Sequence, residues 1–218
     1  MLKKKLNTGI WPMLILLIVA LISTALLALT NTMTAETIAE REAEEAMKVR
    51  RALFPEAEKF ETLELPERWQ DDAKTDRTVS NLAEAARDKD GQLLGLLIRS
   101  HAKGYGGEVP VYLAMDAGGK IVGIEMPAND ETPGLGQKVR APKFYEQFIG
   151  RSAEDFFMTG STQIKKDDSG EEVADSPEVV KKPLSIDAVS GATISSTAVA
   201  DALNKISDIF NELIREVE

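Results

Sequence analysis

A run of small and hydroxyl-bearing residues stands immediately before the last predicted helix of the chain. Residues 187–193 read DAVSGAT, and further hydroxyls follow at Ser195, Ser196 and Thr197. Small residues let a ligand approach the backbone closely. The N-terminus of a helix presents unpaired N–H groups and a positive dipole end, which favour an anion such as phosphate. The pattern therefore predicts either a phosphate-bearing ligand near Thr193 or merely helix caps and turns, which use the same residue types.

A second glycine-containing segment, residues 131–136 (ETPGLG), lies far from the first in the sequence. Pro133 stiffens this loop, and its glycines permit tight turns, so that backbone N–H groups could face a flat ring. Leu135 offers an apolar surface for such a ring. Read alone, the segment could also be a simple turn between a strand and a helix.

The composition excludes several other kinds of site. The chain has no cysteine, which rules out disulfides, thiolate-bound iron–sulfur clusters and zinc–cysteine sites. Its single histidine, His101, rules out a multi-histidine metal site, argues against a serine hydrolase triad, and is expected to be an ordinary surface residue. The net charge is −10 without a basic patch, so we expect no nucleic-acid binding.

An uncharged run at residues 10–29 has the length of a membrane-spanning helix. About 20 apolar residues cross a bilayer, whereas the apolar core of a cleavable signal peptide is usually about 7–15 residues long. We therefore expect a retained anchor rather than a signal peptide. The lysines at residues 3–5 should stay in the cytoplasm, which would place residues 31–218 on the extracytoplasmic side of the cell membrane.

The segments after the anchor predict an α+β fold with an antiparallel sheet and packed helices. Thr34 could cap a solvated stalk helix that Pro55 ends. Residues 56–80 are read as a connection with one short strand. Alternating apolar positions then predict further strands, which we place at residues 93–99, 109–115 and 121–126, the last two joined by a hairpin turn at 116–120.

The C-terminal part is expected to contain a short helix at residues 142–149, an exposed loop at 166–183 and a long amphipathic helix from Ile194. The apolar stripe of that last helix, spaced by three and four residues, comprises Val199, Leu203, Ile206, Phe210, Leu213 and Val217. The expected domains are a cytoplasmic basic tail (1–9), a transmembrane anchor (10–29), a stalk and connection (30–80) and a ligand-binding domain (81–218).

Taken together, the two glycine-containing segments resemble one known family. Residues 187–193 fit the flavinylation motif Asp-x-x-Ser/Thr-Gly-Ala-Thr/Ser of the FMN-binding domains in Rnf and Na⁺-translocating NADH:quinone reductase complexes. Residues 131–136 are similar to the ETPGLG loop of the same family and follow a GYGG segment, residues 104–107, in the expected order. Many relatives carry a histidine shortly before this loop, whereas residues 127–130 are PAND, which leaves a histidine contribution to flavin tuning in doubt.

The resemblance implies that Thr193 forms a phosphoester with FMN, installed from FAD by a separate Mg²⁺-dependent flavin transferase that releases AMP. Asp187 would help to present the motif to that enzyme, and residues 190–192 would line the phosphate and ribityl chain. The residues implied to bind the cofactor are Thr193, Asp187, Ser190, Gly191, Ala192, Glu131, Thr132, Gly134 and Leu135. No metal site is expected, and no catalytic residue acting on a substrate of its own.

The resemblance further implies an electron-carrying component, similar to the G subunit, of a membrane-bound ferredoxin:NAD oxidoreductase complex of the Rnf type. Its partners would be the other membrane subunits, and the anchor could pack against them through small residues such as Ala20, Ser23, Thr24 and Ala25 or serve only as a tether. One alternative is a stand-alone membrane-anchored envelope flavoprotein in another electron-transfer chain. Another is a binding module without redox chemistry, in which residues 190–193 merely cap a helix.

Overall fold

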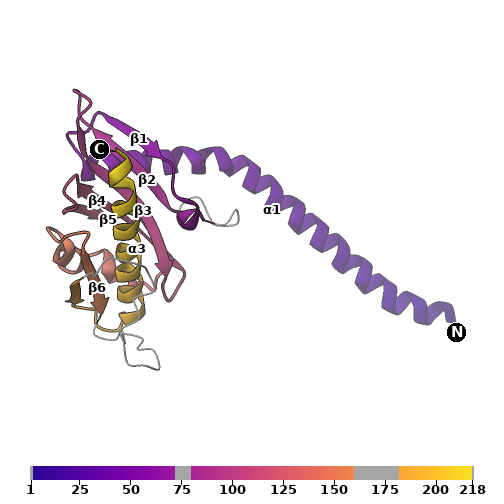
Figure 1. Ribbon diagram of the computed structural model, residues 1–218. Coiled ribbons are helices and arrows are strands. Elements are labelled where there is room, and N and C mark those ends of the chain that lie inside the picture. The colour runs from indigo at the N-terminus through magenta and orange to yellow at the C-terminus, as the bar shows by residue number, and fades with distance from the viewer. Residues whose placement is uncertain (1, 72–79, 160–181, 218) are drawn as a thin grey trace. The chain divides into compact units, whose positions relative to one another are not determined.

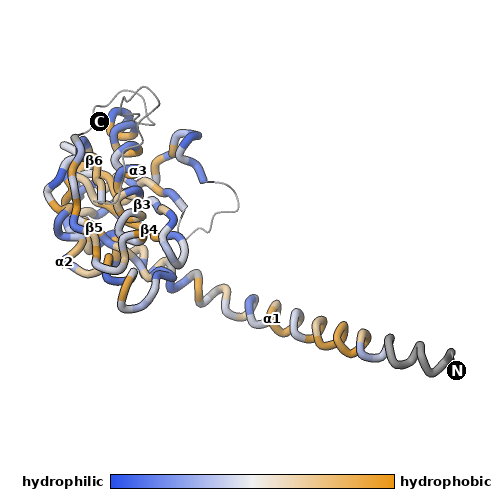
Figure 2. The backbone as a smooth tube through the Cα atoms, turned by 90° about the horizontal axis from the view of Figure 1, so that it is seen from below, coloured by the Kyte–Doolittle hydropathy of each residue, from blue (hydrophilic) through white to orange (hydrophobic). Residues whose placement is uncertain are grey.

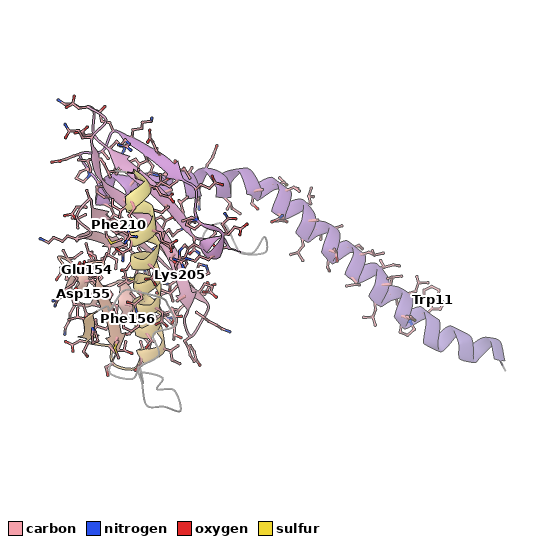
Figure 3. The ribbon with its side chains drawn as sticks, in the orientation of Figure 1. Trp11, Glu154, Asp155, Phe156, Lys205 and Phe210 are labelled. Atoms are coloured by element: carbon pink, nitrogen blue, oxygen red, sulfur yellow. The ribbon has the colours of Figure 1, made fainter. Side chains whose placement is uncertain are left out.

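The computed structural model describes residues 2–71, 80–159 and 182–217, which fall into two units, Met1–Met47 and Lys48–Glu218. The described residues of the first unit, 2–47, are all helical and belong to α1 (Leu2–Leu53). Within α1, the stretch Trp11–Ala35 is long and apolar enough to cross a membrane. Figure 2 shows this stretch as the orange turns of α1, and Figure 3 shows the Trp11 side chain projecting from it.

The predicted break between an anchor and a separate stalk helix is absent, because α1 continues through both segments. Thr34 is not an N-cap: its hydroxyl donates to the carbonyl of Thr30, at 2.9 Å, inside the helix. A threonine in mid-helix can satisfy its hydroxyl in this way, and residues 13–54 contain neither glycine nor proline to stop the helix. The predicted end near Pro55 is confirmed, since α1 ends at Leu53.

The last turn of α1 belongs to the second unit and packs on one face of its sheet. Phe54 is buried there with Leu97, Tyr112 and Ala114. Arg50 donates two hydrogen bonds, of 2.7 and 2.5 Å, to the carboxylate of the buried Glu84. These bonds raise the pKa of the Arg50 guanidinium, and burial partly opposes the rise.

The sheet itself is an antiparallel meander, as predicted, and it has five strands in chain order. Its strands are β1 (Lys59–Leu63), β2 (Leu82–Arg87), β3 (Leu93–Lys103), β4 (Glu108–Asp116) and β5 (Ile121–Glu125). A short 3₁₀ turn, η1 (Glu67–Trp69), follows β1. Strand β2 was not predicted, because its sequence LAEAAR is rich in alanine and glutamate, which favour helices.

Helix α3 (Thr193–Val217) covers the opposite face of the sheet, and Figure 1 shows it in yellow across the strands. The predicted apolar stripe is confirmed. Val199, Leu203, Ile206, Phe210 and Leu213 are buried, and they pack with Leu96, Ile98, Leu113 and Met115 of the sheet. Burial of this stripe against the strands holds the helix in place.

A second, two-stranded sheet lies beside α3. It pairs β6 (Asp155–Thr159) in parallel with β7 (Lys182–Ile186), and in Figure 3 Phe156 marks β6 and Lys205 marks α3 where these elements run side by side. The predicted exposed loop at 166–183 is therefore wrong at residues 182 and 183, which begin β7, and its residues 166–181 lie outside the described ranges. The predicted short helix is found as α2 (Pro142–Tyr145) and η3 (Glu146–Phe148), after the turn η2 (Gly136–Arg140).

Candidate functional site

The two glycine-containing segments meet in the folded chain. A Cβ atom built on Gly191 would lie 3.3 Å from Cδ2 of Leu135, so residues 187–193 and 131–136 are in contact although they are far apart in sequence. Both glycines adopt left-handed backbone conformations, with φ of +77° at Gly191 and +75° at Gly134. Other residues rarely adopt this conformation, so both turns depend on glycine.

Glu131 is a buried residue, 1% exposed, that links the glycine-containing segments through hydrogen bonds. Oε1 accepts the backbone N–H of Gly106 at 2.9 Å, and Oε2 accepts the hydroxyl of Ser195 in the first turn of α3. The carboxylate occupies space that a side chain at Gly104 or Gly136 would fill. One carboxylate thus ties the 104–107 loop, the 131–136 loop and α3 together.

The five hydroxyl groups between residues 190 and 197 differ sharply in their surroundings. Ser196 is fully buried, donates to the carbonyl of Ala192 and accepts the N–H of Val189, both at 3.0 Å. Thr197 is hydrogen-bonded to Thr159 at 2.8 Å, and Ser195 is engaged by Glu131. The other two, Ser190 and Thr193, are exposed.

Thr193 is the first residue of α3, with Ala192 immediately before it. The first helical hydrogen bond runs from the N–H of Ser196 to the carbonyl of Ala192, at 2.9 Å. The geometry of an α-helix leaves the N–H groups of residues 193–195 without intrahelical acceptors, and they carry the positive end of the helix dipole. An anion attached to the Thr193 hydroxyl would therefore lie where the backbone favours negative charge.

Asp187 directly follows β7, and its side chain is exposed. Its backbone is held by the side chain of Gln147: the amide oxygen accepts the Asp187 N–H at 2.9 Å, and the NH₂ group donates to the Asp187 carbonyl at 3.3 Å. The same amide also donates to the carbonyl of Phe144 at 2.7 Å. Sequence analysis missed Gln147, because a single glutamine within the predicted short helix at 142–149 belongs to no motif.

Apolar side chains are exposed on each of the three segments. The exposed fractions are 72% for Tyr105, 44% for Leu135 and 56% for Ile194. The loop that presents Leu135 is closed by the carbonyl of Thr132, which accepts the N–H groups of Leu135 and Gln137 at 3.2 and 3.3 Å. Exposed apolar side chains of this kind are what a flat, partly apolar ligand would need for packing.

His101 is more enclosed than expected of a surface histidine. Its side chain is 15% exposed, and its ring nitrogens lie 3.0 Å from Glu108 and 3.1 Å from Asp71. His101 lies on β3 and Glu108 on β4, the two strands that the 104–107 loop joins. In the described ranges, no group of three or more possible ligand residues could hold a metal ion.

Comparisons with known proteins agree with this geometry. Residues 104–208, which include the 104–107 loop, the 131–136 loop and most of α3, match the FMN-binding domain, and residues 14–52 match the RnfG N-terminal region. The chain is 29% identical over 205 residues to the G subunit of the Na⁺-translocating ferredoxin:NAD⁺ oxidoreductase complex of Acetobacterium woodii, covering 92% of this chain and 90% of the relative.

A relative from Methanosarcina acetivorans, the G subunit of an ion-translocating oxidoreductase complex, is 27% identical over 194 residues, which cover 88% of this chain and 89% of the relative. The crystal structure of NqrC from Shewanella oneidensis has the same fold, with a TM-score of 0.50, 17% identity, and coverage of 76% of this chain and 88% of that one. The chain thus contains a region that matches the FMN-binding domain and, ahead of it, a region that matches the RnfG N-terminal region.

Proposed function

We propose that this chain is the electron-carrying subunit of an ion-translocating oxidoreductase complex of the Rnf type and holds FMN through a phosphoester to Thr193. The observation that carries the assignment is the position of the Thr193 hydroxyl. Thr193 is an exposed residue at the start of α3, two positions after Gly191, which lies close to Leu135, whereas the hydroxyls of Ser195, Ser196 and Thr197 are hydrogen-bonded to protein groups. The relatives, which are G subunits of such complexes, support the choice of complex.

Attachment would follow from the chemistry of a hydroxyl and a pyrophosphate. The Thr193 oxygen would attack the FMN phosphorus of FAD, the bond to the AMP phosphate would break, and the hydroxyl proton would leave. A separate flavin transferase would catalyse this step. Asp187, whose backbone is pinned by Gln147, would help to present the segment to that enzyme.

The bound FMN would supply the redox chemistry, and the protein would bind and orient it. N–H groups of residues 193–195 would face the anionic phosphoester. Exposed Leu135, Ile194 and Tyr105 offer apolar surface for the ring. Because the chain has no cysteine, it cannot hold a thiolate-bound iron–sulfur cluster of its own.

The N-terminal helix would anchor the domain in the cell membrane. The stretch Trp11–Ala35 is long enough to span it, and the lysines at residues 3–5 would remain cytoplasmic. The FMN domain would then lie outside, where lost FMN could not readily be replaced and a covalent link has an advantage. The other membrane subunits of the complex would be its partners, and the match of residues 14–52 to the RnfG N-terminal region favours this over a stand-alone flavoprotein.

Co-expression with a flavin transferase tests the attachment. We expect the full-length protein to fluoresce on a denaturing gel and to gain the mass of one FMN minus one water. Thr193→Ala should be dark and unmodified, whereas Thr193→Ser, which keeps a hydroxyl at the same position, should keep the FMN. A dark wild-type band, or a fluorescent Thr193→Ala band, would refute the assignment. Co-purification with other membrane subunits would separately test the complex.

A further inference from the structure

We infer that Glu131 is a positioning residue rather than a residue that touches the cofactor. It holds together the 104–107 loop, the 131–136 loop and the start of α3, which form the proposed FMN-binding cradle. This inference rests on the proposed function. Both carboxylate oxygens of Glu131 accept protein hydrogen bonds, from Gly106 and Ser195, and the residue is 1% exposed. Both oxygens of its side chain are therefore hydrogen-bonded to the protein in the absence of a ligand.

The burial of this carboxylate is costly and calls for a physical reason. Among the residues that the structure describes, the ion pairs involve other groups and none includes Glu131. An ionised carboxylate loses favourable hydration when it is buried without a cation. Here the loss is offset by a backbone donor, a hydroxyl donor and the positive end of α3. An apolar side chain would fill the space without this cost but could not link three segments.

The Glu131 carboxylate links all three segments of the proposed cradle. Gly106 lies next to exposed Tyr105, Ser195 lies two residues after Thr193, and Glu131 itself begins the loop that presents Leu135. The glycines at 104 and 136 leave the space in which the carboxylate sits. A shift of this one side chain would therefore move the exposed apolar residues relative to the Thr193 hydroxyl.

The linkage also keeps Ser195 from competing with Thr193. The Ser195 hydroxyl belongs to a residue 2% exposed and donates to Glu131, so it is neither accessible nor free to act as a nucleophile. Removing Glu131 would release a second hydroxyl within the first turn of α3. Glu131 thus sets both the shape of the cradle and the hydroxyl that is available for modification.

The test compares Glu131→Ala, Glu131→Gln and Ser195→Ala in the full-length protein co-expressed with a flavin transferase. Leaving a buried hydrogen-bonding group unsatisfied shifts the population of the competent arrangement by about tenfold or more. We therefore expect the rate of FMN incorporation to fall by about that factor in Glu131→Ala and Ser195→Ala. Glu131→Gln should retain most of the rate, because its amide oxygen can accept from Gly106 and its NH₂ can donate to Ser195.

Glu84→Ala is the matched control, since Glu84 is also a buried glutamate, 3% exposed, but is paired with Arg50 on the other face of the sheet. It should lower thermal stability and leave FMN incorporation per folded molecule unchanged. Amide hydrogen exchange in the flavin-free protein provides a second readout: the Gly106 N–H should exchange faster in Glu131→Ala and remain protected in Glu131→Gln.

The outcomes separate this inference from the proposed function. Wild-type incorporation and wild-type Gly106 protection in folded Glu131→Ala would overturn the positioning role. So would equal loss of incorporation in Glu131→Gln and Glu131→Ala, because it would show that the hydrogen bonds are not what matters. If the wild type itself takes up no FMN, the proposed function fails, whereas accelerated exchange at Gly106 in Glu131→Ala would still uphold the linkage.

Discussion

Replacing Gly191 by alanine tests how the contact between the two segments is built. Gly191 has φ of +77°, and an L-residue in the left-handed region costs roughly 1–2 kcal/mol. The added Cβ would also lie 3.3 Å from Cδ2 of Leu135. That atom ends a flexible, 44% exposed side chain, so it can move away by a few tenths of an ångström at little cost.

Gly134 provides a matched control within the same site. Its φ is +75°, and a Cβ there would meet nothing within 4 Å. Gly134→Ala and Gly191→Ala should therefore lose similar stability, about 1–2 kcal/mol each. For a domain of this size, each kcal/mol corresponds to a fall in Tm of about 2–4 °C. Thermal unfolding of the detergent-solubilised full chain, followed by circular dichroism, measures both variants.

The two variants should nevertheless differ in their effect on the cofactor. Gly191→Ala displaces Leu135 beside Thr193 and should slow FMN incorporation more than Gly134→Ala, which displaces no side chain. Truncating Leu135 to alanine in the Gly191→Ala background should remove the steric part of the effect. If Gly191→Ala proves several kcal/mol less stable than Gly134→Ala, the contact is rigid and this reasoning is wrong. If neither variant loses stability, the turns do not depend on glycine.

Two further predictions concern side chains outside the motifs. Gln147→Ala removes the three hydrogen bonds that hold Asp187 and the carbonyl of Phe144, so FMN incorporation should slow by roughly tenfold; an unchanged time course on fluorescent gels would contradict this. Hydrogen bonds from Lys59 and Arg87 lower the pKa of Glu61 below its ordinary value of 4.5. The stability that these hydrogen bonds confer is therefore present above pH 4.5 and is lost as the pH falls through the lowered pKa. Glu61→Gln should therefore have a lower Tm than wild type at neutral pH, and the difference should close in acid; a difference that persists unchanged in acid would refute the charge-based account.

The elements that the sequence predicted correctly are those with a strong local pattern. The apolar run at residues 10–29 was recognised by its length. The alternation in residues 109–115 and the stripe from Val199 to Val217 follow the periods of a strand and of a helix. The glycine turn at 116–120 likewise predicted the hairpin between β4 and β5. These signals depend on neighbouring residues, so no tertiary contact is needed to read them.

The missed elements owe their existence to contacts that are distant in sequence. Strand β2 is alanine-rich and becomes a strand because it lies between β1 and β3. Strand β6 is anchored by the side chain of Asn204, which pairs with the backbone N–H and carbonyl of Phe157 at 2.8 and 2.9 Å. Because β6 pairs with β7 in parallel, no hairpin turn joins the two strands, and the sequence lacks the turn signal that would predict the pair.

For the candidate site, the sequence by itself determined which residue types are present: the threonine at a helix start, the glycine turns and the two motif segments. Only the tertiary structure decided how they are arranged. It brought Leu135 to Gly191, buried Glu131 between Gly106 and Ser195, and placed Gln147 against Asp187. The physical reason is that hydrogen-bonding partners and burial are properties of the folded chain, so one-dimensional spacing identifies the groups but not which of them face a ligand and which hold the others in place.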